Sequence, residues 1–317
     1  MSSRSSSARR PEEREVASLD TAVMVDVARR TVAENRINGG MRRLGRWVLK
    51  NPFAAMASLI ILLYVLVTIF APLLTAYDPN TSSARDALRA PDAAHWFGTD
   101  SIGRDNFART IYGGRTTIIV AATSVVLGGA VGIVLGLLAG YFAGWRRVVI
   151  NRTVDVLFAF PDLILAMGIA AALSPGFLST IVAIAFGAIP PFARITYSAV
   201  VGVKDSEFVQ AARLSGTRAW RIMLMHILPN VTSPILVQFT LSLGFCILAV
   251  AALSFVGLGA QPPTAEWGLM VSEGRNYILS GQWWLTFFPG LAIAVLVLSF
   301  NLLGDTLRDM LDPRVKS

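Results

Sequence analysis

The side chains that most often carry out catalysis are few in this chain and lie far apart in the sequence. Its 317 residues include two histidines, His95 and His226, and one cysteine, Cys246. Their spacing fits no zinc site, and a single cysteine forms no internal disulfide. The phosphate-binding pattern G-x-x-x-x-G-K-[ST] and the nucleophile pattern G-x-S-x-G are also missing. The sequence therefore predicts no catalytic residue, no cofactor-binding residue and no metal ligand, which disfavours an enzyme.

Charged side chains inside long apolar stretches are the second place where chemistry could occur. Asp155, Asp162 and Arg194 lie in such stretches, where ionisable groups are costly and usually functional. Asp162 follows Pro161, and a proline there leaves a backbone carbonyl without its helical partner. Two interpretations stay open. Either Arg194 forms a structural ion pair with one of the acids, or Asp162 faces a wet cavity and contacts a cationic group of a solute.

The composition indicates what kind of scaffold must position these groups. Hydrophobic residues make up 54% of the chain and charged residues only 15%, against about 25% charged residues in an ordinary soluble domain. This excludes a soluble enzyme and a disordered regulator. Six apolar stretches reach the length of about 20 residues that a membrane-spanning helix needs. They cover residues 53–77, 116–142, 148–173, 178–201, 234–258 and 285–307. The fold class predicted is therefore an all-α, polytopic membrane protein with six transmembrane helices.

The excess of positive charge predicts the orientation of these spans. The net charge is +8, which by itself is also typical of a nucleic-acid-binding protein. However, the basic residues cluster before the first span and in alternate short loops, as the positive-inside rule requires of a membrane protein. Both termini are therefore expected in the cytoplasm, and nucleic acid is not expected as a partner. Residues 1–40 are predicted to be a cytoplasmic N-terminal tail, partly disordered, and residues 41–317 the membrane domain.

Two runs of small residues permit close helix packing. Glycines recur at every fourth position from Gly128 to Gly144, so they fall on one helix face that another helix can approach closely. This face is either a packing seam or a surface along which a bundle moves. A second run, which includes Ser254 and Gly257, ends the fifth span. It is either the narrow wall of a solute pathway or a packing seam.

The loop over residues 202–230 is the most informative cytoplasmic segment. Asp205 or Ser206 is a suitable cap for a short helix, with Glu207 in its first turn. Gly216 is expected to end this helix in a left-handed conformation, and a second helix capped by Thr217 is expected to end before Pro229. Such a projecting helix suits docking into a groove on a partner. The alternative is a plain solvated loop helix.

This loop resembles the EAA loop of permease subunits in ATP-binding-cassette (ABC) importers. The family pattern places Glu-Ala-Ala, then Gly, then Leu-Pro in the positions that this chain fills with Gln210, Ala211, Ala212, Gly216, Leu228 and Pro229. Gln210 departs from the family's glutamate. Because it keeps a hydrogen-bonding side chain, the departure puts a specific salt bridge in doubt rather than docking. Glu207, one helical turn earlier, offers a negative charge on nearly the same face.

The likeness extends from about Arg42 to the C-terminus. The segments His95–Asp105, Leu253–Gly268 and Gly304–Arg314 resemble those of the dipeptide/oligopeptide/nickel subfamily, and its second permease type fits best. Two outer segments are therefore expected to contact a solute-binding protein or to gate the outer mouth, unless they form a packed lid. Their candidate residues are Phe97, Gly98, Asp100, Gly103, Arg104, Asp105, Gln261, Pro262, Glu266 and Trp267. Asp162, Ser254 and Gly257 are the candidates for the solute pathway.

The resemblance implies the type I fold of ABC importer permeases and a bacterial inner-membrane location. It also implies a second homologous permease, two ATP-binding subunits that carry ATP and magnesium, and an extracytoplasmic solute-binding protein. Residues 206–216 would couple this chain to the ATPases. Short peptides are the solute ranked first, ahead of glutathione, opines and nickel chelates. A stand-alone secondary transporter or channel is the alternative function. It would need no coupling loop, and the chain of intramembrane acids and histidines typical of proton coupling is not found.

Overall fold

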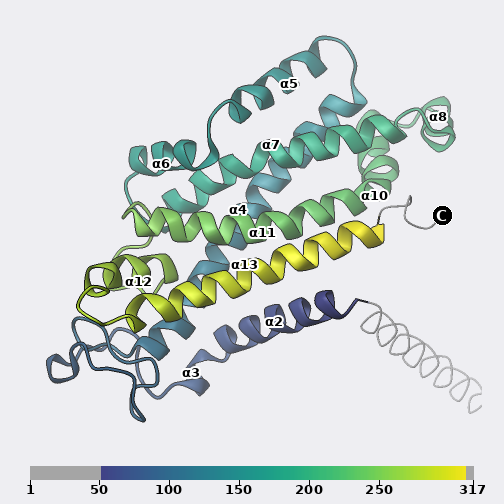
Figure 1. Ribbon diagram of the computed structural model, residues 1–317. Coiled ribbons are helices and arrows are strands. Elements are labelled where there is room, and N and C mark those ends of the chain that lie inside the picture. The colour runs from purple at the N-terminus through teal and green to yellow at the C-terminus, as the bar shows by residue number, and fades with distance from the viewer. Residues whose placement is uncertain (1–50, 312–317) are drawn as a thin grey trace, which may run out of the picture. The chain divides into compact units, whose positions relative to one another are not determined.

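The computed structural model describes residues 51–311, which from Phe53 onward belong to one compact unit. The described residues are mostly helical and contain no β-strand, apart from one isolated bridge between Thr99 and Asp105 (Figure 1). This confirms the all-α class. The predicted tail 1–40 lies outside the described residues.

Five helices within residues 51–311 are long and apolar enough to cross a membrane. They are α2 (Pro52–Ile69), α4 (Asn106–Tyr141), α7 (Phe177–Val203), α11 (Thr232–Phe255) and α13 (Trp284–Leu311). Each overlaps one predicted stretch, but α2 ends before residue 77 and is followed by the short helix α3 (Ala71–Leu74). Helix α4 begins ten residues earlier than expected because the Asp105 side chain caps it, accepting a hydrogen bond from the Ala108 N–H at 2.7 Å.

The stretch expected to span the membrane over residues 148–173 is not one continuous helix. The chain forms two helices there, α5 (Trp145–Phe158) and α6 (Asp162–Ala172), and their axes differ by 89°. Pro161 explains the break because it has no N–H group and its backbone adopts φ −58° and ψ 127°, outside the helical region. Together the two helices are apolar enough for a broken span or a re-entrant segment, and the break places Asp162 in the first turn of α6.

Short helices lie at the two ends of the bundle. At one end are α8 (Glu207–Leu214), α9 (Ala219–Arg221), the π-helix η2 (Ile222–Ile227) and α10 (Leu228–Asn230). At the other end, α12 (Trp267–Gly274) and the short 3₁₀ helix η3 (Arg275–Tyr277) lie near the start of α4 (Figure 1). A further 3₁₀ turn, η1, covers Ala84–Asp86. The two segments expected on opposite sides of the membrane are thus at opposite ends of the helices.

The closest helix pair in the core is α4 with α7. A Cβ atom built at Gly132 would lie 2.5 Å from the Ile189 carbonyl oxygen, and one at Gly136 would lie 2.6 Å from that of Ala193. Gly128 and Gly140 make similar approaches to α7. The repeat from Gly128 to Gly140 is therefore a tight packing seam, as the first of its two interpretations held, whereas Gly144 lies beyond the end of α4 in open space. Helix α11 packs between α7 and α13 and completes the core.

Candidate functional site

Helix α8 is held against the bundle by one side and exposes the other. Val209 and Ala212 are buried, whereas Glu207, Gln210 and Ala211 are exposed. The Gln210 side chain does not point to a charge in this chain, since its Nε2 donates to the Asp205 carbonyl oxygen at 2.8 Å. Gln210 thus closes the start of the helix through a hydrogen bond that a glutamate cannot donate.

The two ends of α8 differ from one another in how they are capped. Ser206 occupies the N-cap position, but its hydroxyl donates to the Val203 carbonyl at 2.6 Å, so the expected side-chain cap is not formed. The C-terminal end follows the prediction. Gly216 has φ +72°, and the N–H groups of Gly216 and Thr217 donate to the carbonyls of Arg213 and Ala212, which is the Schellman arrangement that stops a helix.

The segment after Gly216 differs from expectation. Arg218, not Thr217, is the N-cap residue, and the helical path continues through Pro229 instead of ending before it. A proline inside a helix lacks an N–H and clashes with the carbonyl four residues earlier. The wider turns of the π-helix η2, directly before Leu228 and Pro229, relieve this clash. The Asn230 side chain also donates to the His226 carbonyl at 2.7 Å.

A groove of about 520 Å³ lies beside α8. Its lining includes Ala211 and Ala212 from α8 and Met225, His226 and Asn230 from the following segment. Large apolar side chains project around it into solvent, and Leu214 is 90% exposed. Exposed apolar groups gathered at one end of a molecule mark an interaction surface.

Residues His95–Asp105, expected on the outer side, form a compact segment held together by polar contacts. His95 Nδ1 lies 2.8 Å from the Asp105 carboxylate, and Arg104 Nε lies 2.5 Å from that of Asp100. The His95 backbone N–H donates to the Asp92 carboxylate and lowers the pKa of that carboxyl. Gly98, Asp100, Gly103, Arg104 and Asp105 are all buried. Phe97 stacks on Phe288 with 3.8 Å between ring centroids.

Arg104 and Arg109 connect this segment to Glu273 of α12. Arg104 Nη2 lies 3.0 Å, and Arg109 Nη2 3.2 Å, from the Glu273 carboxylate. Arg109 also donates to the carbonyls of Pro79 and Pro263. Sequence reasoning missed Arg109 and Glu273, because residues 164 positions apart gave no local signal of pairing. Together they join the loop before α4, the start of α4 and α12 at one end of the bundle.

The second outer segment divides into a buried and an exposed part. Glu266 and Trp267 are within 1% of full burial, and the Trp267 indole donates to the Thr110 carbonyl at 2.7 Å. Gln261 and Pro262 are exposed. The packed-lid interpretation therefore fits Glu266 and Trp267, as it fits most of the first segment. Among the outer candidates, Gln261 and Pro262 are the ones with surface free for a partner.

The three pathway candidates are not brought together. Ser254 is buried and its hydroxyl accepts the Ala260 N–H at 3.1 Å, so it supports the turn after α11. The neighbouring Ala251 lies against Gly268, and this part of the small-residue run is a packing seam. Gly257, with φ +88°, forms that turn and is exposed, as is Asp162.

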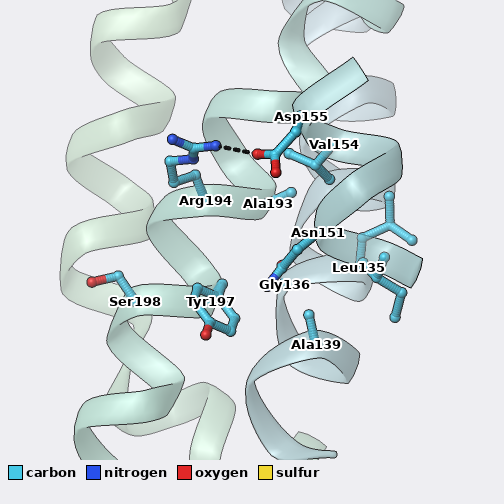
Figure 2. Close-up of a pocket in the computed structure, with 11 residues that line it drawn as sticks. Leu135, Gly136, Ala139, Asn151, Val154, Asp155, Ala193, Arg194, Tyr197 and Ser198 are labelled. Carbon is cyan, nitrogen blue, oxygen red and sulfur yellow. Dashed lines mark hydrogen bonds and ion pairs between the residues drawn. The ribbon is translucent and has the colours of Figure 1, made fainter. Parts of the chain in front are cut away.

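A pocket lined by one cation and one anion lies between α4, α5 and α7 (Figure 2). Its volume is about 340 Å³. Arg194 Nη2 lies 2.6 Å from Asp155 Oδ1, and the Arg194 guanidinium also lies 4.8 Å from the centroid of the Phe158 ring. Of the two acids considered for Arg194, the structure selects Asp155. Among the described residues, no group of three or more His, Cys, Asp or Glu side chains is arranged to hold a metal ion.

Comparison with known proteins agrees with this geometry. Residues 132–317 match the family model described as "Binding-protein-dependent transport system inner membrane component". Residues 43–91 match the "N-terminal TM domain of oligopeptide transport permease C". The first match covers the glycine seam from Gly132 onward, the broken segment, α8 and α12.

Several curated relatives align over most of their length. The dipeptide transport system permease protein DppC of Alkalihalophilus pseudofirmus is 44% identical over 268 residues, covering 84% of this chain and 88% of the relative. The probable D,D-dipeptide transport system permease protein DdpC of Escherichia coli is 42% identical, covering 84% and 90%. The glutathione transport system permease protein GsiD of Pectobacterium atrosepticum is 40% identical, covering 90% and 95%.

A solved structure shares the fold at lower identity. An inward-facing conformation of the MetNI methionine ABC transporter aligns with a TM-score of 0.54 and 18% identity, covering 65% of this chain and 98% of the matched chain. The family match extends over more than half of the chain, and the relatives are 40–44% identical to it. The chain therefore belongs to the family of binding-protein-dependent transport system inner membrane components, and it is a permease subunit of an ABC importer.

Proposed function

We propose that this permease subunit carries short peptides and that α8 is the element through which a cytoplasmic ATPase acts on it. The observation that carries the proposal is the surface of α8. It exposes the small residue Ala211 beside a groove of about 520 Å³, while Val209 and Ala212 fix the helix to the bundle. A helix anchored in this way transmits a push or pull to the rest of the chain.

The proposed assembly contains a second homologous permease, two ATP-binding subunits and an extracytoplasmic solute-binding protein. ATP and magnesium belong to the ATP-binding subunits. ATP drives transport only if it binds the two conformations of the complex with different affinity. Helix α8 passes this difference to the membrane helices. Family membership supports this assembly over the stand-alone transporter or channel, since an ABC permease works within a complex.

The proposed orientation places α8 and both termini in the cytoplasm of a bacterial inner membrane. Its support is the cluster of basic residues at the α8 end, which comprises Lys204, Arg213, Arg218 and Arg221. The segment held by Arg104 and Arg109 then lies on the outer side. There, exposed Gln261 and Pro262 are the proposed contacts for the solute-binding protein, and the largely buried Phe97–Asp105 segment supports them as part of the outer gate.

The relatives' names support the choice of solute. They describe transport of dipeptides, D,D-dipeptides and glutathione, which are all short peptides with free charged groups. Asp162, exposed at the break between α5 and α6, and Gly257, exposed after α11, are the proposed pathway residues.

Substituting Ala211 tests the coupling role. In the assembled complex, Ala211→Arg places a long cation in the groove and should abolish the ATP hydrolysis that solute-loaded binding protein stimulates. Ala211→Ser, a change of similar size to the native residue, should leave it near the wild-type rate. Co-purification of the second permease shows that the variant has folded. An Ala211→Arg complex with full stimulated hydrolysis would overturn the proposal.

A further inference from the structure

The pocket shown in Figure 2 places two opposite charges inside the membrane region without burying them. Arg194 lies on α7, nine residues or roughly 14 Å along the axis before the helix ends at Val203. Asp155 lies on α5, near the break before α6. The Arg194 side chain is 60% exposed and that of Asp155 is 45% exposed. Exposed charges at this depth face water or protein rather than lipid tails. We therefore expect this side of the chain to border an aqueous space in the assembled transporter.

The ion pair itself is open to exchange. Ion pairs with such exposure contribute little to stability, and only Nη2 of the guanidinium contacts Asp155. Within residues 51–311, the other N–H groups of Arg194 have no hydrogen-bond partner. The Phe158 ring, 4.8 Å from the guanidinium carbon, holds the cation in place by a cation–π contact. A ligand carboxylate can therefore approach Arg194 without disturbing its position.

Further polar groups surround the pair. The side chains of Asn151, Tyr197 and Ser198 line the same pocket and have no side-chain hydrogen bond to any described residue. The volume of about 340 Å³ lies in the range of small-molecule sites. Figure 2 shows Asn151 on the Asp155 side and Tyr197 on the Arg194 helix. A concave site with one cation, one anion and free amide and hydroxyl groups matches a zwitterion.

We propose that this pocket is a transit site for a small zwitterionic solute. The solute's ammonium group replaces Arg194 as the partner of Asp155, and its carboxylate replaces Asp155 as the partner of Arg194. The inference rests on the proposed function, because it identifies the permease's own contact with an unblocked short peptide. It differs from the earlier expectation for Asp162, which lies outside this pocket.

The test measures peptide binding to the whole ATP-free transporter complex in the absence of its solute-binding protein. The complex is placed in nanodiscs of phosphatidylglycerol, because phosphatidylethanolamine carries a competing ammonium group. Tritiated dialanine is the probe, and unlabelled dialanine, N-acetyl-dialanine and dialanine amide compete with it. We expect each blocked peptide to compete at least tenfold more weakly than dialanine. Addition of phosphatidylethanolamine should reduce binding if its headgroup reaches the same pocket.

Variants then locate the site. Asp155→Asn should weaken the binding of dialanine about tenfold and remove the preference against N-acetyl-dialanine. Arg194→Gln should remove the preference against dialanine amide. Asp305→Asn and Arg308→Gln on α13, which do not line the pocket, should retain wild-type binding.

Two results would overturn the proposal. One is a wild-type complex that shows no preference for free end groups while its ATP hydrolysis still responds to loaded binding protein, which leaves the importer function intact. Because this measurement uses only the wild-type complex, it does not depend on whether the variants fold. The other is a preference for free end groups that persists in both Asp155→Asn and Arg194→Gln. Equal loss of this preference in the two α13 variants would also overturn the proposal.

Discussion

The Glu266 carboxyl group lies 2.9 Å from the Thr117 hydroxyl and so joins the start of α12 to α4. The Thr117 hydroxyl is also 3.0 Å from the Gly113 carbonyl oxygen. One hydroxyl proton serves only one of these acceptors. We expect a protonated Glu266 to donate to Thr117 instead, which leaves the Thr117 proton for the Gly113 carbonyl. Burial raises the pKa of Glu266, although hydrogen bonds from the Gly268 and Leu269 N–H groups and from the Ser254 and Thr117 side chains act in the opposite direction.

Replacing Glu266 tests whether its carboxyl group is neutral. Glu266→Gln keeps a donor toward Thr117 and should cost the complex about 1 kcal/mol, whereas Glu266→Ala leaves buried groups unpaired and should cost about 2–3 kcal/mol. Because the folded-state pKa is raised, wild-type stability should fall relative to Glu266→Gln as the pH rises above the ordinary value of 4.5. Thermal unfolding between pH 5 and 8 measures this. If the wild-type complex instead becomes more stable relative to Glu266→Gln as the pH rises, the Glu266 carboxyl group is ionised in the folded protein.

The Arg104–Arg109–Glu273 contacts predict a second stability effect. Glu273→Gln removes the carboxylate that lies 3.0 Å and 3.2 Å from the two guanidinium groups. Both arginines are buried, and they would then share Asp100. We expect the free energy of unfolding to fall by about 1–3 kcal/mol. This is less than the full cost of breaking a buried ion pair, because the Glu273 side chain is 28% exposed. Asp86→Asn breaks the exposed pair with Arg89 and should have no measurable effect. Equal melting temperatures for Glu273→Gln and wild type would contradict the prediction.

The sequence predicted what depends on local pattern and missed what depends on distant partners. Apolar length indicated the spans, and the spacing from Gln210 to Pro229 indicated a loop whose coupling role stays a prediction. Gly216 was placed in its left-handed conformation because this requirement is local. By contrast, the contact between Arg109 and Glu273 and the choice of Asp155 for Arg194 depend on how the helices pack. Pro161 and Pro229 show the same limit. One breaks a span by 89°, while the other is absorbed by a π-helix.

The glycine seam predicts a purely steric effect. A Cβ at Gly132 would lie 2.5 Å from the Ile189 carbonyl oxygen, so Gly132→Ala should force α4 and α7 apart and cost about 1–3 kcal/mol. Gly187 lies on α7 with open space around its Cβ position. Gly187→Ala is the control and should be neutral or slightly stabilising, because alanine favours a helix. Thermal unfolding of the purified complex distinguishes the two. Equal effects would mean that the seam is not rigid.

Gly216 predicts the opposite case, a conformational effect without a clash. Its φ is +72°, yet a Cβ there would meet no atom within 4 Å. Gly216→Val should therefore cost about 1–2 kcal/mol from backbone strain alone, and Gly216→Asn less, because asparagine tolerates this conformation. The strain acts at the C-terminal end of α8. Stimulated ATP hydrolysis should consequently fall in the order glycine, asparagine, valine, with assembly of the two permeases unchanged. If valine supports the same hydrolysis rate as glycine, the left-handed turn does not set the position of α8 for docking.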